Sequence, residues 1–147
     1  MPRAKAAKQA RPTARPIIGN VLVVEDDALL ALDIEQNLRD AGAALVQLCP
    51  STTEALALLR EHRFDAIVLD VHLADRSDGW AIAELVDSVG PRPPRIGFST
   101  GAPQDIPAGI AELGIVLAKP YHPQDLVRAV SAPRRRGLLA RLRALAA

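Results

Sequence analysis

Short apolar runs alternate along the chain with longer stretches in which apolar residues recur every three to four positions. A short run bounded by polar or turn-forming residues is typical of a buried strand, and the longer period is typical of a helix with one buried face. The short runs predict five strands, at residues 17–24, 44–49, 66–69, 95–99 and 115–118. The longer period predicts helices at residues 28–41, 51–62, 78–88 and 123–132, with a short helix at 107–113.

Local signals at the helix ends agree with these ranges. Ser51 followed by Glu54 matches the pattern in which a serine and a glutamate satisfy the free backbone groups at a helix start. Gly42 is suited to end the first helix, because glycine adopts the left-handed conformation that often follows one. Either Asp26 or Asp27 could cap the start of that helix.

Five strands that read as apolar on both faces, separated by helices, indicate a parallel sheet covered on both sides. The expected fold class is therefore α/β, with a doubly wound sheet in a single domain. In such sheets, functional groups gather outside the carboxyl ends of the strands. The residues at those ends are the first candidates for a site.

Positive charge is concentrated at the two ends of the sequence. Residues 1–16 hold five basic residues and residues 133–147 hold five more, and neither stretch contains an acid. We expect a disordered basic tail at 1–16 and a basic, weakly amphipathic tail at 133–147, around a domain at residues 17–132. That domain contains all 17 acids, so it should attract a divalent cation or a basic partner rather than nucleic acid.

Composition excludes several other classes of protein. No apolar run approaches the ~20 residues that a membrane-spanning helix needs. The single cysteine, Cys49, excludes an internal disulfide framework and a multi-cysteine metal site. With two Phe, one Trp and one Tyr, a surface that stacks nucleic-acid bases is not expected. We therefore expect a cytoplasmic protein with no membrane span and no nucleic-acid partner.

Acids, a hydroxyl and an ammonium group stand at the predicted strand ends. They are Glu25 and Asp26 after the first strand, Asp70 after the third, Thr100 after the fourth and Lys119 after the fifth. Taken singly, each has an ordinary structural explanation, such as capping a helix or closing a turn. Together, carboxylates and a lysine at one sheet edge are suited to bind a cation and an anion side by side. The combination indicates a phosphoryl-transfer site.

The order and spacing of four motifs resemble the receiver domain of bacterial two-component response regulators. The motifs are VLVVEDD at 21–27, IVLD at 67–70, FSTG at 98–101 and AKPY at 118–121. The resemblance covers residues 17–132. It implies a flavodoxin-like (βα)₅ fold with a five-stranded parallel sheet in the order 2-1-3-4-5.

The resemblance also implies the chemistry of the site. Asp70 would accept a phosphoryl group from a phosphohistidine on a partner protein. Glu25, Asp26, Asp70 and the backbone carbonyl of His72 would hold Mg²⁺. The Thr100 hydroxyl would bond one phosphoryl oxygen and Lys119 would neutralise another.

Residues near the fifth strand bear on signalling. The Lys119–Pro120 peptide bond is expected to be cis, a geometry almost confined to bonds before proline. Three residues before Lys119, where the family often has an aromatic residue that switches rotamer, this chain has Val116. Residues 98–107 are similar to a subgroup of mostly stand-alone receivers with a Phe-Ala-Thr-Gly signature and a reduced fourth helix. We expect residues 102–113 to change order on phosphorylation.

The stretch after Pro133 is too short for an output domain, so the sequence indicates a single-domain response regulator that switches partner binding. It is expected to be a phosphoacceptor signalling domain rather than an enzyme. Its partners would be a sensor histidine kinase or histidine phosphotransfer protein, in a phosphorelay, and an unidentified output protein. The alternative is a phosphorylation-independent, receiver-like module that binds proteins.

Overall fold

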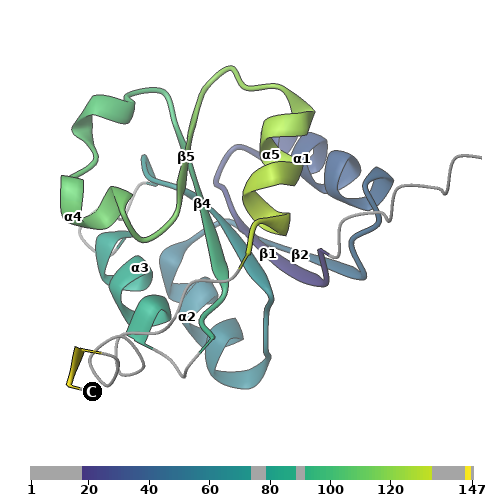
Figure 1. Cartoon of the computed structure of the whole chain (residues 1–147). Coiled ribbons are helices and arrows are strands. Elements are labelled where there is room, and N and C mark those ends of the chain that lie inside the picture. The colour runs from purple at the N-terminus through teal and green to yellow at the C-terminus, as the bar shows by residue number, and fades with distance from the viewer. Residues whose placement is uncertain (1–17, 74–78, 89–91, 134–144, 147) are drawn as a thin grey trace, which may run out of the picture.

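Five parallel strands form the centre of the computed structural model, which describes residues 18–73, 79–88, 92–133 and 145–146 (Figure 1). The strands are β1 (Asn20–Val24), β2 (Leu45–Cys49), β3 (Ala66–Asp70), β4 (Arg95–Thr100) and β5 (Ile115–Ala118). They lie in the order β2-β1-β3-β4-β5, with every neighbouring pair parallel. This confirms the expected doubly wound α/β sheet and its strand order.

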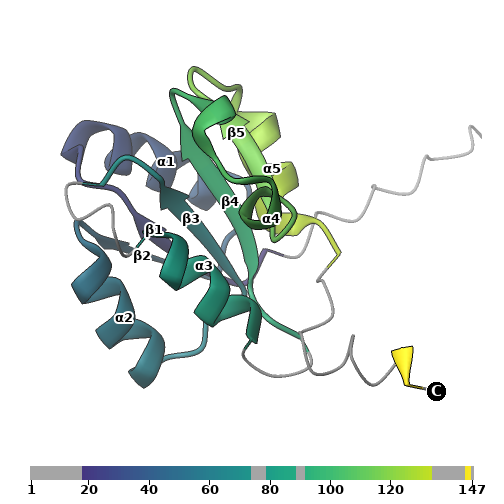
Figure 2. The ribbon, with the colours of Figure 1, turned by 90° about the vertical axis from the view of Figure 1, so that its left-hand side faces the viewer.

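Helices cover both faces of the sheet. They are α1 (Ala28–Asp40), α2 (Thr52–Glu61), α3 (Gly79–Ser88), the 3-10 helix η2 (Pro103–Asp105), α4 (Ala108–Ala111) and α5 (Pro123–Ser131). Figure 2 looks onto the face covered by α2, α3 and α4, whereas α1 and α5 lie behind the sheet. The predicted ranges of α1, α2, α3 and α5 agree with the structure to within one residue at each end, and the first strand begins at Asn20, later than its predicted start.

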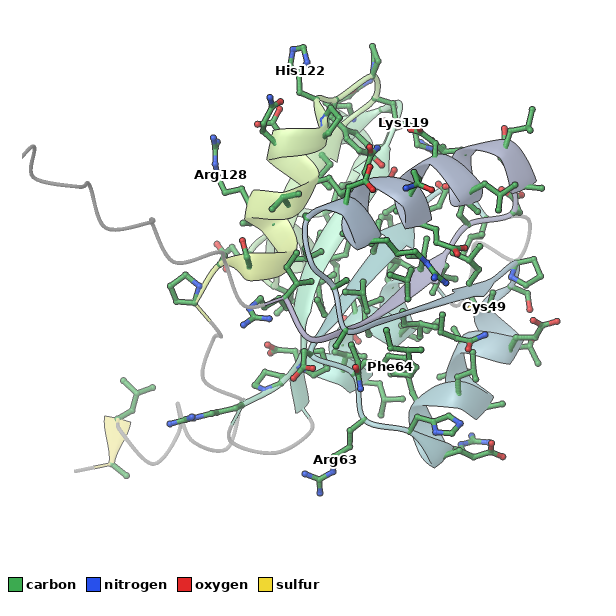
Figure 3. All side chains as sticks on the ribbon, turned by 90° about the vertical axis from the view of Figure 1, so that its right-hand side faces the viewer. Cys49, Arg63, Phe64, Lys119, His122 and Arg128 are labelled. Atoms are coloured by element: carbon green, nitrogen blue, oxygen red, sulfur yellow. The ribbon has the colours of Figure 1, made fainter. Side chains whose placement is uncertain are left out.

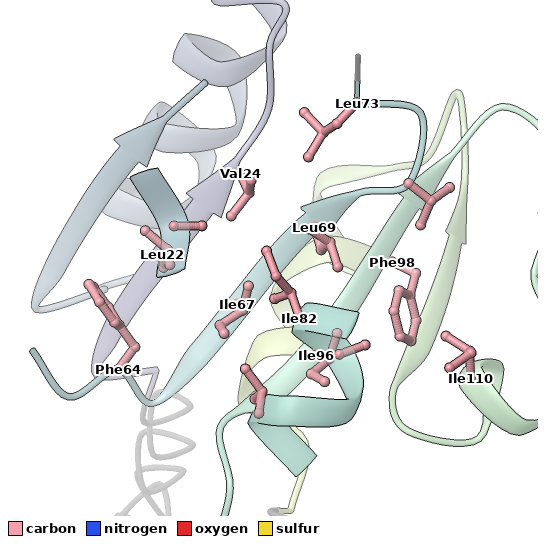
Figure 4. Close-up of a cluster of buried hydrophobic side chains, with 14 of the residues drawn as sticks. Leu22, Val24, Phe64, Ile67, Leu69, Leu73, Ile82, Ile96, Phe98 and Ile110 are labelled. Carbon is pink, nitrogen blue, oxygen red and sulfur yellow. The ribbon is translucent and has the colours of Figure 1, made fainter. Parts of the chain in front are cut away.

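Alternating residues of the strands fill two apolar cores. The first core lies under α2, α3 and α4 and is drawn in Figure 4; it includes Leu22, Val24, Ile67, Leu69, Ile82, Ile96, Phe98 and Ile110. The second lies under α1 and α5; it includes Val21, Val23, Ile34, Leu38, Val68, Leu117, Leu126 and Val130. Because successive side chains of a strand point to opposite faces, β1, β2, β3 and β5 supply residues to both cores, whereas β4 supplies Ile96 and Phe98 to the first core alone.

The two edge strands are less buried than the central strands. Leu45 in β2 exposes 50% of its surface and Ile115 in β5 exposes 37%. An edge strand has a neighbour on one side alone, so its side chains are less covered than those of central strands. All five residues of β3, between β1 and β4, are buried.

Capping side chains set where the first two helices begin. The carboxylate of Asp27 accepts hydrogen bonds from the backbone N–H groups of Leu29 and Leu30, both at 3.0 Å. The sequence allowed either Asp26 or Asp27 to cap this helix, and the structure shows that Asp27 does so. Asp26 is therefore available for other contacts. The Ser51 hydroxyl accepts from the Glu54 N–H at 3.2 Å, as expected at the start of α2.

The end of α1 is a Schellman motif, in which two N–H groups fold back onto carbonyls of the last turn. The N–H of Ala43 donates to the Leu38 carbonyl and that of Gly42 donates to the Arg39 carbonyl, each at 3.0 Å. Gly42 has φ +97°, a backbone conformation that is energetically unfavourable for residues with a Cβ atom. The glycine thus ends the helix as predicted.

The fourth helix is shorter than its predicted range of 107–113. α4 has four residues, preceded by η2, and two buried side chains, Ile106 and Ile110, hold this segment against the first core. A helix of one turn is not stable alone. The order of this segment therefore depends on its packing against the sheet.

Gly114→Ala is expected to lower the free energy of unfolding by about 1 to 3 kcal/mol. A Cβ at Gly114 would lie 2.2 Å from the Ile96 carbonyl oxygen, and β5 would have to separate from β4 to relieve the clash. Gly109→Ala is the matched control, because its Cβ would enter open space and alanine favours a helix by about 1 kcal/mol over glycine. Urea denaturation measures both; equal stability of Gly114→Ala and wild type would contradict the prediction.

The basic tails expected at residues 1–16 and 133–147 lie outside the described residues, apart from Pro133, Leu145 and Ala146. Among the helices that the structure describes, none is long and apolar enough to cross a bilayer.

Candidate functional site

The parallel sheet brings the predicted site residues to one edge. Glu25 directly follows β1, while Asp70 and Thr100 are the last residues of β3 and β4. Lys119 directly follows β5, and its backbone N–H donates to the Thr100 carbonyl at 2.7 Å. Figure 3 shows Lys119 at this edge of the sheet and Phe64 at the opposite edge.

Three acids form a compact cluster at this edge. Glu25, Asp26 and Asp70 can each offer one carboxylate oxygen, and these oxygens lie within 4.8 Å of one another. Glu25 and Asp70 are buried, exposing 4% and 3% of their surfaces, whereas Asp26 is exposed. The cluster is thus closed on the side of the sheet and open to solvent on the side of Asp26.

Lys119 is the cation that faces the buried acids. Its Nζ lies 3.6 Å from Asp70 Oδ2 and 3.7 Å from Glu25 Oε2. These separations allow attraction but exceed the ~2.9 Å of a close charge-assisted hydrogen bond. The Lys119–Pro120 peptide bond is cis, as predicted. The ammonium is therefore shared between two carboxylates rather than committed to one.

The pKa of the Glu25 carboxyl group is raised by its surroundings. Burial, together with the neighbouring Asp70 carboxyl group, raises the pKa of Glu25 to about 7, against the lowering effect of the Asp27 N–H and of Lys119. Its Oε1 accepts from the Asp27 N–H at 3.2 Å. Among the described side chains, Glu25 Oε2 is the one buried polar atom with no hydrogen-bond partner. A buried carboxylate oxygen of this kind is costly unless a cation compensates it.

The cluster fits a hard divalent cation. Magnesium ions prefer oxygen ligands, and they commonly use one or two carboxylates while keeping several waters. Glu25, Asp26 and Asp70 can supply carboxylate oxygens, and Glu25 Oε2, which has no hydrogen bond, is suited to face a cation. The N–H of His72 donates to Asp70 Oδ1 at 2.8 Å, which places His72 at the same turn. Its carbonyl as a further ligand stays a prediction.

Thr100 makes a contact that the sequence did not predict. Its Oγ1 lies 3.1 Å from Nε2 of His72 and accepts from the Ala102 N–H at 2.9 Å, and the residue is fully buried. The hydroxyl that should meet a phosphoryl oxygen is therefore held beside the His72 ring. The sequence placed both residues at this edge but gave no signal that their side chains meet.

A second hydroxyl contact lies directly beneath the site. The Ser99 hydroxyl lies 3.1 Å from the Tyr121 hydroxyl, and Ser99 is fully buried. Tyr121 is half-buried against the second core, and burial raises the pKa of its hydroxyl. Both residues lie within the FSTG and AKPY motifs, which predict no role for either. Strand alternation alone could have shown that Ser99 faces away from Thr100.

An open groove of about 300 Å³ runs beside this contact, between β5 and the start of α5. Its lining includes Val116, Pro120, Tyr121, His122 and Asp125. Val116 stands where related domains often have an aromatic side chain, and it is partly buried against the first core. Tyr121 is thus the aromatic side chain that joins the groove to the site.

The chain is similar to known response regulators in sequence. The family model described as the response regulator receiver domain matches residues 21–131. The phyllosphere-induced regulator PhyR of Methylorubrum extorquens is 28% identical over 124 residues, which make up 82% of this chain and 45% of PhyR. The transcriptional regulatory protein PdtaR of Mycobacterium tuberculosis is 28% identical over 113 residues, 75% of this chain and 54% of PdtaR.

A solved structure agrees with the sequence comparisons. The crystal structure of the response regulator PhyR from Brucella abortus matches with a TM-score of 0.63 at 28% identity, covering 79% of this chain and 47% of that one. This chain therefore spans about half the length of the curated relatives described above.

Proposed function

The chain belongs to the response regulator receiver domain family, and from this premise we propose that Asp70 accepts a phosphoryl group from a phosphohistidine. The donor would be a sensor histidine kinase or a histidine phosphotransfer protein in a two-component phosphorelay. One observation carries the proposal: the Asp70 carboxylate is buried beside two other acids, with the Lys119 ammonium at 3.6 Å. A nucleophilic carboxylate held beside a cation is suited to receive an anionic group.

The transfer exchanges one bond to phosphorus for another. An oxygen of Asp70 attacks the phosphorus atom of the phosphohistidine, so an oxygen–phosphorus bond forms as the nitrogen–phosphorus bond breaks. The departing imidazole keeps the electron pair and takes up a proton at that nitrogen. Lys119 neutralises charge on a phosphoryl oxygen, and the Thr100 hydroxyl donates to another once it turns from His72.

The acid cluster would hold Mg²⁺ through Glu25, Asp26, Asp70 and the His72 carbonyl. A bound divalent cation supplies positive charge that offsets repulsion between the carboxylates and the incoming phosphoryl oxygens. Without it, three carboxylates and one ammonium leave the site with excess negative charge. Phosphoryl transfer should therefore depend on the metal.

The phosphorylated domain would act by altering how it binds an output protein. The groove beside β5 is lined by Ala118 and Pro120, the two neighbours of Lys119 in the chain. The order change expected in residues 102–113 stays a prediction, as does membership of the Phe-Ala-Thr-Gly subgroup.

Wild-type protein is expected to gain one phosphoryl group from acetyl phosphate when Mg²⁺ is present and none when EDTA removes it. The physical reason is charge: an anionic donor must approach a cluster of carboxylates. Intact-mass spectrometry at low temperature measures the labelled fraction over time. Equal labelling with and without metal would contradict the role of the acid cluster. No labelling of a folded domain would instead favour the phosphorylation-independent protein-binding module.

A further inference from the structure

Neighbouring residues at the end of β4 point to opposite faces of the sheet. Phe98 belongs to the first core, so Thr100, two residues later, points to the same side, where it meets His72. Ser99 points to the other side and meets Tyr121, which packs against the second core under α1 and α5. The strand end therefore presents one hydroxyl to the site and one to the opposite face.

Both partners of the Ser99–Tyr121 contact are tied to the site through the backbone. Ser99 directly precedes Thr100, and it pairs in register with Asp70. Tyr121 follows Lys119 by two residues, across the cis bond to Pro120. A backbone displacement of Thr100 or Lys119 toward a phosphoryl group would therefore also displace Ser99 or Tyr121.

The acids of the site also influence the Tyr121 hydroxyl electrostatically. Burial is the largest cause of the raised pKa of Tyr121, and the carboxylates of Glu25, Asp33 and Asp70 raise it further, while the Ser99 hydroxyl lowers it. The tyrosine hydroxyl thus responds to the charge of the acid cluster as well as to its hydrogen-bond partner.

We propose that Tyr121 is a positioning residue whose hydrogen bond to Ser99 couples occupancy of the Asp70 site to the groove between β5 and α5. Tyr121 would take the place of the aromatic residue that related domains often have at the position of Val116, because a valine has no ring or hydroxyl to perform this coupling. This inference rests on the proposed function of Asp70. When the phosphoryl group draws Thr100 and Lys119 toward itself, the Ser99–Tyr121 contact changes length, and the tyrosine ring shifts in the groove that it helps to line.

Coupling of this kind works in both directions. If occupancy of the site alters the Ser99–Tyr121 contact, then removing the contact must alter the affinity of the site by the same free energy. A net hydrogen bond contributes about 1 kcal/mol, so we expect a change of about 3- to 10-fold in the dissociation constant for a phosphoryl mimic. The mimic is beryllofluoride with Mg²⁺.

The single tyrosine of the chain makes the contact directly observable. Protein labelled with ¹³C at the tyrosine ring carbon that bears the hydroxyl gives one signal, which reports the hydrogen bond of Tyr121. We expect this signal to shift when beryllofluoride and Mg²⁺ are added, and we expect no shift in Asp70→Asn. The ¹⁹F spectrum of the same sample shows whether beryllofluoride is bound.

The two spectra separate failure of this inference from failure of the proposed function. Bound beryllofluoride with an unchanged tyrosine signal would overturn the coupling and leave the role of Asp70 intact. No bound beryllofluoride in a folded domain would overturn both.

Variants test whether the contact acts on the site beyond its effect on stability. Tyr121→Phe and Ser99→Ala each remove one hydroxyl, and each should change beryllofluoride affinity by the same factor as the double variant, because either change alone breaks the contact. Ser131→Ala is the matched control, since it removes a hydroxyl that bonds the Val127 carbonyl within α5. Urea denaturation confirms folding. Wild-type affinity in both single variants, or effects that multiply in the double variant, would overturn the proposal.

Discussion

Asp70→Asn is expected to abolish phosphoryl labelling while the domain stays folded. The amide has nearly the same shape as the carboxylate, so the packing around the end of β3 is kept. It lacks the anionic oxygen that attacks phosphorus, so no oxygen–phosphorus bond can form at this position. Intact-mass spectrometry after incubation with acetyl phosphate and Mg²⁺ measures the loss, and circular dichroism confirms the fold.

The matched control is Asp105→Asn, which makes the same chemical change at an exposed acid in η2. It should be labelled at the wild-type rate. Labelling of Asp70→Asn to the wild-type extent would show that another residue is the phosphoacceptor, and the proposed function of Asp70 would then be wrong.

Glu25→Gln is expected to stabilise the metal-free protein by about 1 to 3 kcal/mol at pH 8 and to have little effect near pH 4.5. In the folded protein, burial raises the pKa of Glu25 from 4.5 to about 7. Above pH 7 the folded state must hold this carboxylate charged in a buried cluster, at a cost that the unfolded chain does not bear. Glutamine is neutral at every pH and removes that cost.

The direction of the pH dependence follows from proton uptake. Between pH 4.5 and about 7, the folded state binds more protons at Glu25 than the unfolded state does. The contribution of this group to stability is therefore full below pH 4.5 and is lost as the pH rises through about 7. The wild type should lose stability across this window relative to Glu25→Gln.

Urea denaturation in EDTA at several pH values between 4.5 and 8 measures this difference. Glu84→Gln, at an exposed position of α3, is the control and should leave the pH profile unchanged. Adding Mg²⁺ at pH 8 should stabilise the wild type more than Glu25→Gln, because the cation compensates the buried charge. Parallel pH profiles for wild type and Glu25→Gln would contradict the raised pKa.

Much of the site could be predicted because parallel strands bring their carboxyl ends to one edge. Once the apolar runs located β1, β3, β4 and β5, the acids, hydroxyl and lysine that follow them had to gather there. The side-chain contacts within the site could not be predicted in the same way. Whether Thr100 meets His72 depends on the path of the turn after β3, which is set by packing of the whole edge.

The same limit applies to the ends of the helices. Two neighbouring acids could cap α1, and the choice of Asp27 depends on which carboxylate the backbone turns toward the free N–H groups. That choice leaves Asp26 beside Glu25 and Asp70 in the cluster. Exposure of Leu45 and Ile115 likewise depends on which strands become edges, a property of strand order rather than of local sequence.

The sequence by itself determined the order of strands and helices, the parallel sheet and the set of residues at its carboxyl edge, because periodicity and caps act along neighbouring residues. The tertiary structure alone decided which of these groups touch. It places Lys119 between two carboxylates and Ser99 against Tyr121, and it leaves Glu25 Oε2 without a hydrogen bond. Such contacts join residues far apart in the chain. Their lengths and their effects on pKa depend on burial and on strand register, which exist only once the sheet and its helices have packed together.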